Sequence, residues 1–268
     1  MHGEFFGKPV SDCAGFCRGA ALVYFRNELK QEGSKTMFEQ LDYTASLAEN
    51  EYPCVSVLRS MEAAARIHTH QLGIDRPHML EAYGAVWMIA RCALHLESAV
   101  VTSAPLTVRT WHRGLIRGIV YRDYDLYQNG KWIGEAVQTW VLVDSVRRML
   151  VRMDRLPELR DVPHPEQMKT LRPPKPILSR PLQEASPIFA GQDELDENGH
   201  INNANYVALV LNTMPEPIRN ISRLELNYHH ECFAGVPLPR KLYQDEREAF
   251  VRLHTPEGAA AFDLYAEY

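Results

Sequence analysis

The sequence predicts an α+β fold made of two similar units, in each of which an antiparallel β-sheet wraps a central helix. A helix-periodic segment followed by several strand-like segments occurs twice along the chain. A proline-rich segment that holds eight of the 17 prolines separates the two occurrences. Because a helix needs a surface on which to bury its apolar stripe, a curved sheet is a suitable partner for each helix.

The first half begins with one long helix. Apolar residues recur at helical spacing from Cys54 to Leu72, with Ser56 as the predicted N-cap and Gly73 as the C-cap glycine. Four strand-like segments follow, at residues 83–98, 106–113, 117–128 and 131–144. Asn129-Gly130 lies between the last two and favours a tight hairpin, because both residues tolerate positive φ.

The second half repeats this pattern in shorter form. A strand is predicted at 187–192 and a helix at 202–214, which Pro215 and Pro217 end. Four further strands are predicted, at residues 221–232, 237–245, 248–255 and 260–268. The resulting domains are an N-terminal extension outside the core (1–36, with Met37 as the natural start), an N-terminal unit (37–156), a basic proline-rich linker (157–186) and a C-terminal unit (187–268).

Composition excludes several classes of protein. The apolar fraction of 46% and the charged fraction of 24% are those of a globular protein. A net charge of −5 argues against nucleic acid as the main partner. No run approaches the ~18 apolar residues of a membrane span, and no secretory signal is evident. The five cysteines are odd in number and scattered, which indicates reduced thiols and a cytoplasmic protein.

The stretch DENGHINNANY, Asp196 to Tyr206, has two interpretations. It is rich in turn-forming residues, and Asn202 suits a helix N-cap, so it can be only a turn that begins a helix. However, Asp196, Asn198 and His200 alternate directly before a helix N-terminus, whose unpaired N–H groups can hold an oxyanion. The stretch is therefore also a candidate site for acyl chemistry.

A second polar stretch, YHHEC, Tyr228 to Cys232, follows on a predicted strand. Its residues could bind a metal, but the spacing matches no common metal motif. Alternatively, Cys232 could act as a nucleophile, or Glu231 as a general base oriented by His200 and Asn198. Strict strand alternation points Glu231 away from the helix, so this site requires either a bulge near His229 or a position outside the sheet-to-helix core.

Together the two motifs resemble the acyl-acyl carrier protein thioesterases of plants and bacteria. The resembling pattern is D-x-N-x-H-I-N-N followed by Y-x-x-E-C, and VWMIARCALHLES, APLTVRTWHRG and AVQTWVLVDSVRRM in the first half also resemble this family. The resemblance covers roughly residues 37–268 and implies two fused hotdog units that hydrolyse the thioester of fatty acyl carrier protein. It places the catalytic set on Asp196, Asn198, His200 and Glu231, with Cys232 as an alternative nucleophile. Two departures are His229-His230, where plant members tend to have arginines, and Gly199, where they often have glutamine.

The implied mechanism needs no metal and no cofactor, because a thioester carbonyl is already electrophilic. Glu231 would deprotonate water, and N–H groups at Asn202, Asn203 and Ala204 would hold the oxyanion. The acyl chain is expected along the first helix. The residues expected to set its length are Val57, Met61, Ala65 and Trp87. These four could equally be ordinary core residues. The implied partner is acyl carrier protein, which is acidic. The arginines expected to dock it are Arg147, Arg148, Arg152 and Arg155. These arginines could equally be a solvated face beside the linker.

Three alternatives stay open at this point. The protein could instead be a hotdog acyl-CoA thioesterase, a hotdog dehydratase, or a non-catalytic protein that binds acyl groups. The last alternative leaves the two polar motifs without a purpose, and no helix-turn-helix signal indicates a regulator. The sequence fixes neither the acyl chain length nor the oligomeric state, although a homodimer is compatible with it.

Overall fold

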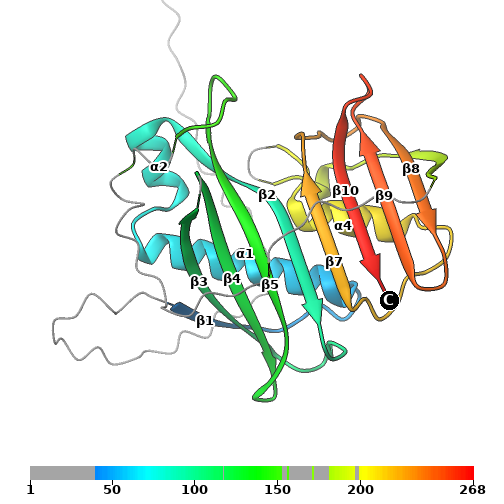
Figure 1. The fold of residues 1–268 in the computed structure, drawn as a ribbon, viewed down its shortest axis with the longest axis horizontal. Helices are drawn as coiled ribbons and strands as arrows, with labels where there is room; N and C mark the ends of the chain where they lie inside the picture. Colours follow the sequence, from blue (N-terminus) through cyan, green and yellow to red (C-terminus); the bar gives the residue numbers. More distant parts are fainter. Residues whose placement is uncertain (1–39, 117, 153–155, 157–170, 172–180, 197–198) are drawn as a thin grey trace, which may run out of the picture. The chain divides into compact units, whose positions relative to one another are not determined.

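A computed structural model of the chain describes residues 40–116, 118–152, 156, 171, 181–196 and 199–268 (Figure 1). The predicted N-terminal extension, 1–36, and most of the predicted linker, 157–186, lie outside the described residues. All described residues belong to one compact unit that spans Gly33–Tyr268. None of the described helices is long and apolar enough to cross a membrane.

The described residues form one ten-stranded antiparallel sheet. Its spatial order is β1-β3-β4-β5-β2-β7-β10-β9-β8-β6. The strands of the first half are β1 (Gln40–Ala45), β2 (Ala85–Leu96), β3 (Leu106–Ile116), β4 (Ile119–Gln128) and β5 (Lys131–Asp144). Those of the second half are β6 (Gln183–Ile188), β7 (Arg223–Tyr228), β8 (Leu238–Gln244), β9 (Glu248–His254) and β10 (Ala260–Glu267).

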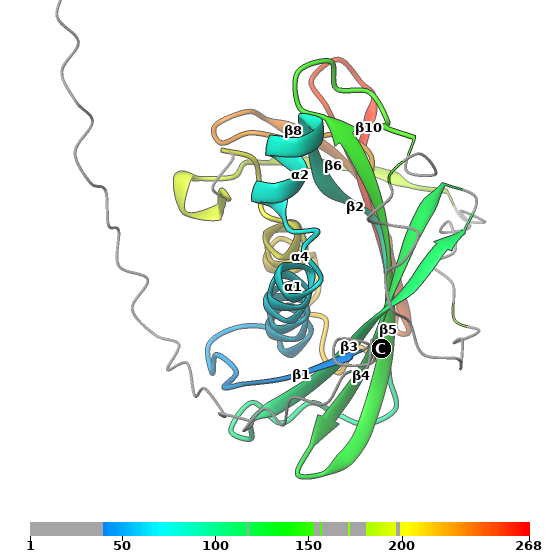
Figure 2. The ribbon, with the colours of Figure 1, turned by 90° about the vertical axis from the view of Figure 1, so that its left-hand side faces the viewer.

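The two halves join where β2 pairs with β7, with Cys92 opposite Leu226. Helix α1 (Pro53–Gln71) belongs to the first half and α4 (Asn203–Asn212) to the second. Figure 2 shows both helices on the same face of the sheet, and their buried residues share one apolar core with it. The predicted α+β fold of two hotdog units, each with a helix against an antiparallel sheet, is confirmed.

Helices α1 and α4 run antiparallel and are in direct contact. The Tyr52 hydroxyl, at the start of α1, donates to the Leu211 carbonyl near the end of α4, at 3.2 Å. Further along α1, Arg59 Nη2 donates to Asn205 Oδ1 at 2.6 Å. The middle of α1 therefore lies beside the N-terminal end of α4.

The predicted N-cap of the first helix is wrong. The N-cap is Tyr52, and Pro53 occupies the first helical position, where its missing N–H costs nothing and its fixed φ favours the helix. Ser56 lies inside the helix and its hydroxyl donates to Glu51 Oε2 at 2.7 Å. The predicted C-terminal glycine, Gly73, has φ of +69° and follows the C-cap residue Leu72.

The sequence analysis missed two elements and misplaced a third. Strand β1 was not predicted, and neither was the short helix α2 (Arg76–Tyr83), which Asp75 caps through its bond from His78 N and Gly84 ends at φ of +60°. Strand β6 ends at Ile188, whereas the prediction placed a strand at 187–192. The residues after it include a short 3-10 turn, η2 (Gln192–Glu194).

The hairpin between β4 and β5 is confirmed. Asn129 and Gly130 have φ of +51° and +73°, which is the left-handed conformation that the two central residues of such a turn require. The predicted boundaries of β5, 131–144, match the structure. This hairpin carries the chain into the turn after Asp144, which contributes to the site described next.

Candidate active site

The loop before α4 is a tight turn closed by Asp196. Its backbone N–H donates to the His200 carbonyl at 2.7 Å, and its Oδ1 accepts from His200 N at 3.1 Å. Gly199 has φ of +77°, a conformation that glycine adopts without steric cost. The turn thus presents His200 directly in front of the helix. Asn198 lies outside the described residues.

Asn202 caps α4, as predicted, and its Oδ1 accepts from Ala204 N at 2.9 Å. The N–H of Asn202 donates to the Glu194 carbonyl at 3.0 Å. Among the described residues, the N–H of Asn203 finds no acceptor. Of the three backbone donors expected to hold an oxyanion, the one on Asn203 is therefore available.

The chain leaves the sheet directly after β7, so strand alternation does not apply to Glu231. His229 N and His230 N both donate to the Ala261 carbonyl, at 2.9 and 3.1 Å, so two consecutive residues oppose one residue of the paired chain, as in a β-bulge. Ile201 N then donates to the Cys232 carbonyl at 2.9 Å, which fixes this segment beside the loop before α4. This bulge-like pairing at His229, one of the two arrangements that the sequence analysis required, lies directly before Glu231 and redirects it.

The side chains of His200 and Glu231 lie close together at the N-terminal end of α4. His200 Nε2 lies 3.5 Å from Glu231 Oε2, and both side chains are about one-fifth exposed, at 21% and 22%. The ring of Phe233 lies edge-on to that of His200, with centroids 5.1 Å apart. A carboxylate and an imidazole at this distance, largely shielded from bulk water, can orient and deprotonate a water molecule.

A third side chain in this cluster comes from the first half. The guanidinium of Arg148 forms an ion pair with the same Glu231 oxygen. Arg148 sits in the turn after β5 at φ of +56°, and Asp144 builds that turn by accepting from Val146 N and Arg147 N at 2.9 and 2.7 Å. One of the arginines expected to dock a partner is thus in contact with the candidate base.

Cys232, which carries the alternative nucleophile, is buried, with 3% exposure. Burial raises its pKa above the ordinary value of a thiol. The nearest polar groups are the His230 carbonyl, 3.8 Å from the sulfur, and the Tyr206 hydroxyl, which accepts from Cys232 N at 3.0 Å. This environment disfavours the thiolate that a nucleophilic mechanism needs.

The residues expected to contact an acyl chain do not form one group. Val57 and Met61 are fully buried in the core shared by the two helices, and Ala65 is 1% exposed on the same helix. Trp87 packs instead in a separate apolar cluster with Ile74 and Met79, and its Nε1 donates to the Ile74 carbonyl at 2.8 Å.

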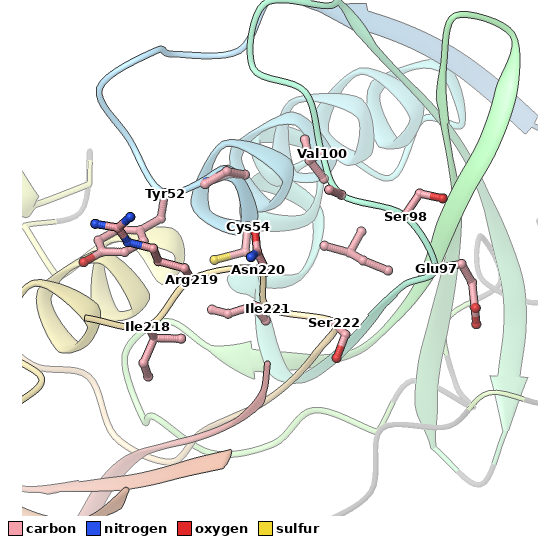
Figure 3. A pocket seen from close by; sticks show the side chains of 13 residues that line it. Tyr52, Cys54, Glu97, Ser98, Val100, Ile218, Arg219, Asn220, Ile221 and Ser222 are labelled. Carbon is pink, nitrogen blue, oxygen red and sulfur yellow. The ribbon is translucent and has the colours of Figure 1, made fainter. Parts of the chain in front are cut away.

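A cavity of about 430 Å³ lies elsewhere, at the N-terminal end of α1 (Figure 3). Both halves of the chain line it, through Cys54 on α1, residues 96–100 after β2 and residues 218–222 before β7. It contains none of the four predicted acyl-chain residues. Among the described residues, no group of three histidine, cysteine, aspartate or glutamate side chains could hold a metal ion.

Of the remaining arginines expected to dock a partner, Arg147 and Arg152 are exposed and Arg155 lies outside the described residues. His229 and His230 have partners of their own. His229 Nε2 lies 3.0 Å from Asp263 Oδ2, and His230 Nδ1 lies 2.7 Å from the Ala260 carbonyl. These two histidines therefore pair with β10 rather than with the candidate base.

Glu62 on α1 also lies near this site and was not predicted from the sequence. Its Oε2 accepts from Asn202 Nδ2 at 3.2 Å, so a carboxyl of the first half reaches the capping residue of α4. Burial raises its pKa, and Asp196 acts in the same direction, while Asn202, Arg59 and Arg66 oppose the shift. The signal was an acidic residue directly after Met61, inside the apolar pattern of the first helix.

Comparisons with known proteins agree on one family. The family model for the acyl-ACP thioesterase N-terminal domain matches residues 38–161, and that for the C-terminal domain matches residues 190–255. An oleoyl-acyl carrier protein thioesterase of Arabidopsis thaliana is 27% identical over 169 residues, and the match covers 55% of this chain and 44% of the relative. A palmitoyl-acyl carrier protein thioesterase of Gossypium hirsutum is 24% identical over 165 residues, and the match covers 55% of this chain and 38% of the relative. The match thus spans less than half the length of these curated relatives.

Two solved structures are similar over nearly their whole length. An acyl-ACP thioesterase of Bacteroides thetaiotaomicron superposes with a TM-score of 0.74 at 20% identity, covering 85% of this chain and 97% of that one. The 12:0-ACP thioesterase of Umbellularia californica gives 0.66 at 17% identity, covering 89% and 98%. At these identities the likeness concerns the fold.

Proposed function

The chain belongs to the acyl-ACP thioesterase family, and from that premise we propose that it hydrolyses the thioester between a fatty acyl chain and acyl carrier protein. The products are a free fatty acid and the carrier with its free thiol. The observation that carries this proposal is that His200 Nε2 lies 3.5 Å from Glu231 Oε2 at the N-terminal end of α4. The two residues are 31 positions apart in the sequence. Such a pair beside backbone donors suits acyl transfer to water.

In the proposed reaction Glu231 is the general base. It takes a proton from a water molecule whose oxygen attacks the thioester carbonyl carbon, and the carbonyl electrons move onto the oxygen. The N–H of Asn203 donates to that oxyanion, where one such donor is typically worth ~2.7–4 kcal/mol. The carbon–sulfur bond then breaks, and the leaving thiolate receives a proton from the Glu231–His200 pair.

The other members of the proposed set have supporting roles. Asp196 holds His200 through the two backbone contacts that close the turn. Asn198 is proposed to orient the substrate or the water, as the family pattern implies. Cys232 is not assigned a covalent role, because its buried thiol with a raised pKa is a poor source of thiolate.

We place the acyl chain along α1, with Val57, Met61 and Ala65 as the residues that limit its length. All three belong to the buried face of the helix that runs beside α4. Trp87 belongs to another apolar cluster, so it is not assigned to this pocket. An enlarged side chain, as in Ala65→Leu, should shift the preferred substrate toward shorter acyl chains.

For carrier docking we propose the turn after β5. Arg147 and Arg152 are exposed there, and so are the apolar side chains of Val146, Met149 and Leu150, at 86%, 65% and 73%. A basic surface with apolar residues suits an acidic partner, and Arg148 joins this turn to Glu231. Charge reversal of Arg147 and Arg152 should weaken turnover of carrier-bound substrate more than that of a short-chain thioester. Arg247→Glu, in the turn between β8 and β9, is the matched control.

The deciding experiment measures hydrolysis of a panel of acyl-carrier substrates by the wild type, Glu231→Gln and Cys232→Ala. The same acyl groups on coenzyme A test carrier preference, and product masses distinguish hydrolysis from water elimination. We expect the glutamate variant to lose at least ~100-fold in kcat and the cysteine variant to keep most activity. Binding of acyl-carrier substrates without any turnover by the wild type would refute the proposal.

A further inference from the structure

Glu62 lies near the candidate site, and the proposed mechanism gives it no role. It lies midway along α1, in the first half, yet its carboxyl is hydrogen-bonded to Asn202 at the start of α4. Glu62 is partly exposed, but desolvating its carboxyl costs free energy that apolar packing would not, so a residue of this kind at a candidate site calls for a function.

Asn202 is held from two directions. Its carboxamide oxygen accepts from Ala204 N at 2.9 Å, which caps the helix, while its Nδ2 donates to Glu62 Oε2 at 3.2 Å. A free carboxamide can rotate and exchange its oxygen for its nitrogen, which would place a donor against the Ala204 N–H. The bond to Glu62 selects the orientation that caps α4.

The neighbouring Asn205 is held in the same way, also from the first half. Its Oδ1 accepts from Arg59 Nη2 at 2.6 Å, and its Nδ2 donates to the Glu194 carbonyl at 2.8 Å. Arg59 is itself bound to Glu51, at 2.8 Å. Helix α1 therefore contacts the start of α4 through two side-chain hydrogen bonds. The bonded residues are three positions apart on each side.

We propose that Glu62 is a positioning residue of the candidate site. It fixes the Asn202 carboxamide, and through Asn202 it fixes the first turn of α4. The Asn203 N–H of that turn is the donor proposed to hold the oxyanion. This inference rests on the proposed function and adds to it a contribution from the first half. Because a misplacement of about 1 Å can cost ~10²-fold in rate, the grip on this turn has a measurable effect on turnover.

The charge of Glu62 matters as well as its position. The ionisable or charged groups that face it are Arg59 and Arg66 on its own helix, Asp196 in the loop before α4, Cys92 on β2, Tyr124 on β4 and Tyr228 on β7. Burial raises the pKa of Glu62, which favours the neutral form. A neutral carboxyl supports Asn202 without opposing the negative charge that develops on the substrate, whereas the ionised form opposes it.

The test compares Glu62→Ala and Glu62→Gln with the wild type on acyl-carrier substrate. Glutamine keeps an acceptor oxygen for Asn202 but cannot ionise. We expect Glu62→Ala to lower kcat about 10- to 100-fold with KM within about twofold, and Glu62→Gln to stay within about threefold at pH 7. As the pH rises through the raised pKa of Glu62, the wild type should lose kcat through one ionisation that Glu62→Gln lacks. Glu81→Gln, an exposed carboxyl on α2, is the control with wild-type kinetics.

Amide hydrogen exchange provides a readout that does not depend on turnover. The N–H groups of Ala204 and Asn205 should exchange faster in Glu62→Ala than in the wild type and Glu62→Gln, with the rest of the core unchanged. A wild type that hydrolyses no thioester would end the proposed function, yet the exchange rates would still decide the role of Glu62. The inference would be overturned if Glu62→Ala kept the kcat and the exchange rates of the wild type. It would also be overturned if Glu62→Ala and Glu62→Gln lost kcat equally.

Discussion

Arg148 forms an ion pair with Glu231, and the two residues come from different halves of the chain. The side chain of Arg148 is 44% exposed and that of Glu231 is 22% exposed. The contact occupies the same Glu231 oxygen, Oε2, that faces His200. It therefore links the surface proposed for carrier docking to the proposed base, because a partner that attracts Arg148 away would free Glu231.

The first prediction concerns Arg148→Met, which keeps much of the side-chain length and removes the charge. A half-exposed ion pair is worth ~0–1 kcal/mol, so kcat/KM on a short-chain thioester should rise, by no more than about fivefold. Turnover of carrier-bound substrate should fall, because a docking charge is lost. Arg147→Met, its exposed neighbour, should affect only the carrier-bound substrate. A tenfold loss on the short-chain substrate would instead assign Arg148 to transition-state stabilisation.

The second prediction concerns the reactivity of Cys232. Because the thiol is buried and its pKa is raised, alkylation by iodoacetamide at pH 8 should be slow in the folded protein. Mass spectrometry of the peptide that contains Cys232 measures the rate. The same peptide in protein unfolded with urea should react at least ~10-fold faster, since the unfolded thiol has its ordinary pKa. Equal rates would indicate an activated cysteine and return the covalent mechanism to consideration.

The third prediction concerns packing near the start of β5. A Cβ atom on Gly134 would lie 2.3 Å from the His95 backbone oxygen, on the paired strand β2. Because backbone atoms of a central strand cannot move aside, Gly134→Ala should lower the free energy of unfolding by ~1–3 kcal/mol. Urea denaturation measures this change. Lys131→Ala, at the exposed start of the same strand, should stay within ~0.5 kcal/mol.

The fourth prediction concerns Asp263, a buried carboxylate on β10. Burial alone would raise its pKa, but bonds from His229 and from Arg252, at 3.0, 2.6 and 2.9 Å, outweigh that effect and hold the pKa below its ordinary value. A pKa lowered by folding contributes stability that is present above the unfolded value of about 3.9 and is lost as pH falls through the folded value.

Asp263→Asn should therefore destabilise the protein at pH 7 by ~1.5–3 kcal/mol, and the difference from the wild type should shrink below about pH 4. Urea denaturation between pH 7 and pH 3 provides the measurement. Asp193→Asn, at an exposed position in η2, should follow the wild type at every pH. A difference between Asp263→Asn and the wild type that stays constant down to pH 3 would contradict the titration argument.

The predictions from sequence succeeded where the signal was local. The apolar period of α1, the hairpin at Asn129-Gly130 and the cap at Asn202 each depend on residues within a few positions of one another. The errors have local causes too. Ser56 resembled a cap, but Pro53 at the first helical position fixed the start earlier. Helix α2 was missed although Asp75 and Gly84, a good cap at each end, enclose it.

The sequence by itself determined the two helix-and-meander units and the polar residues between which the chemistry is proposed, because periodicity and capping are properties of neighbouring residues. Only the tertiary structure decided what those residues face. Glu231 points toward His200 because the chain leaves the sheet after Tyr228. The pairing of β2 with β7 joins the two halves in one sheet. Arg148 and Glu62 therefore reach the site from the first half. These contacts join residues 83 and 140 positions apart (231 − 148 and 202 − 62), and no local pattern encodes them.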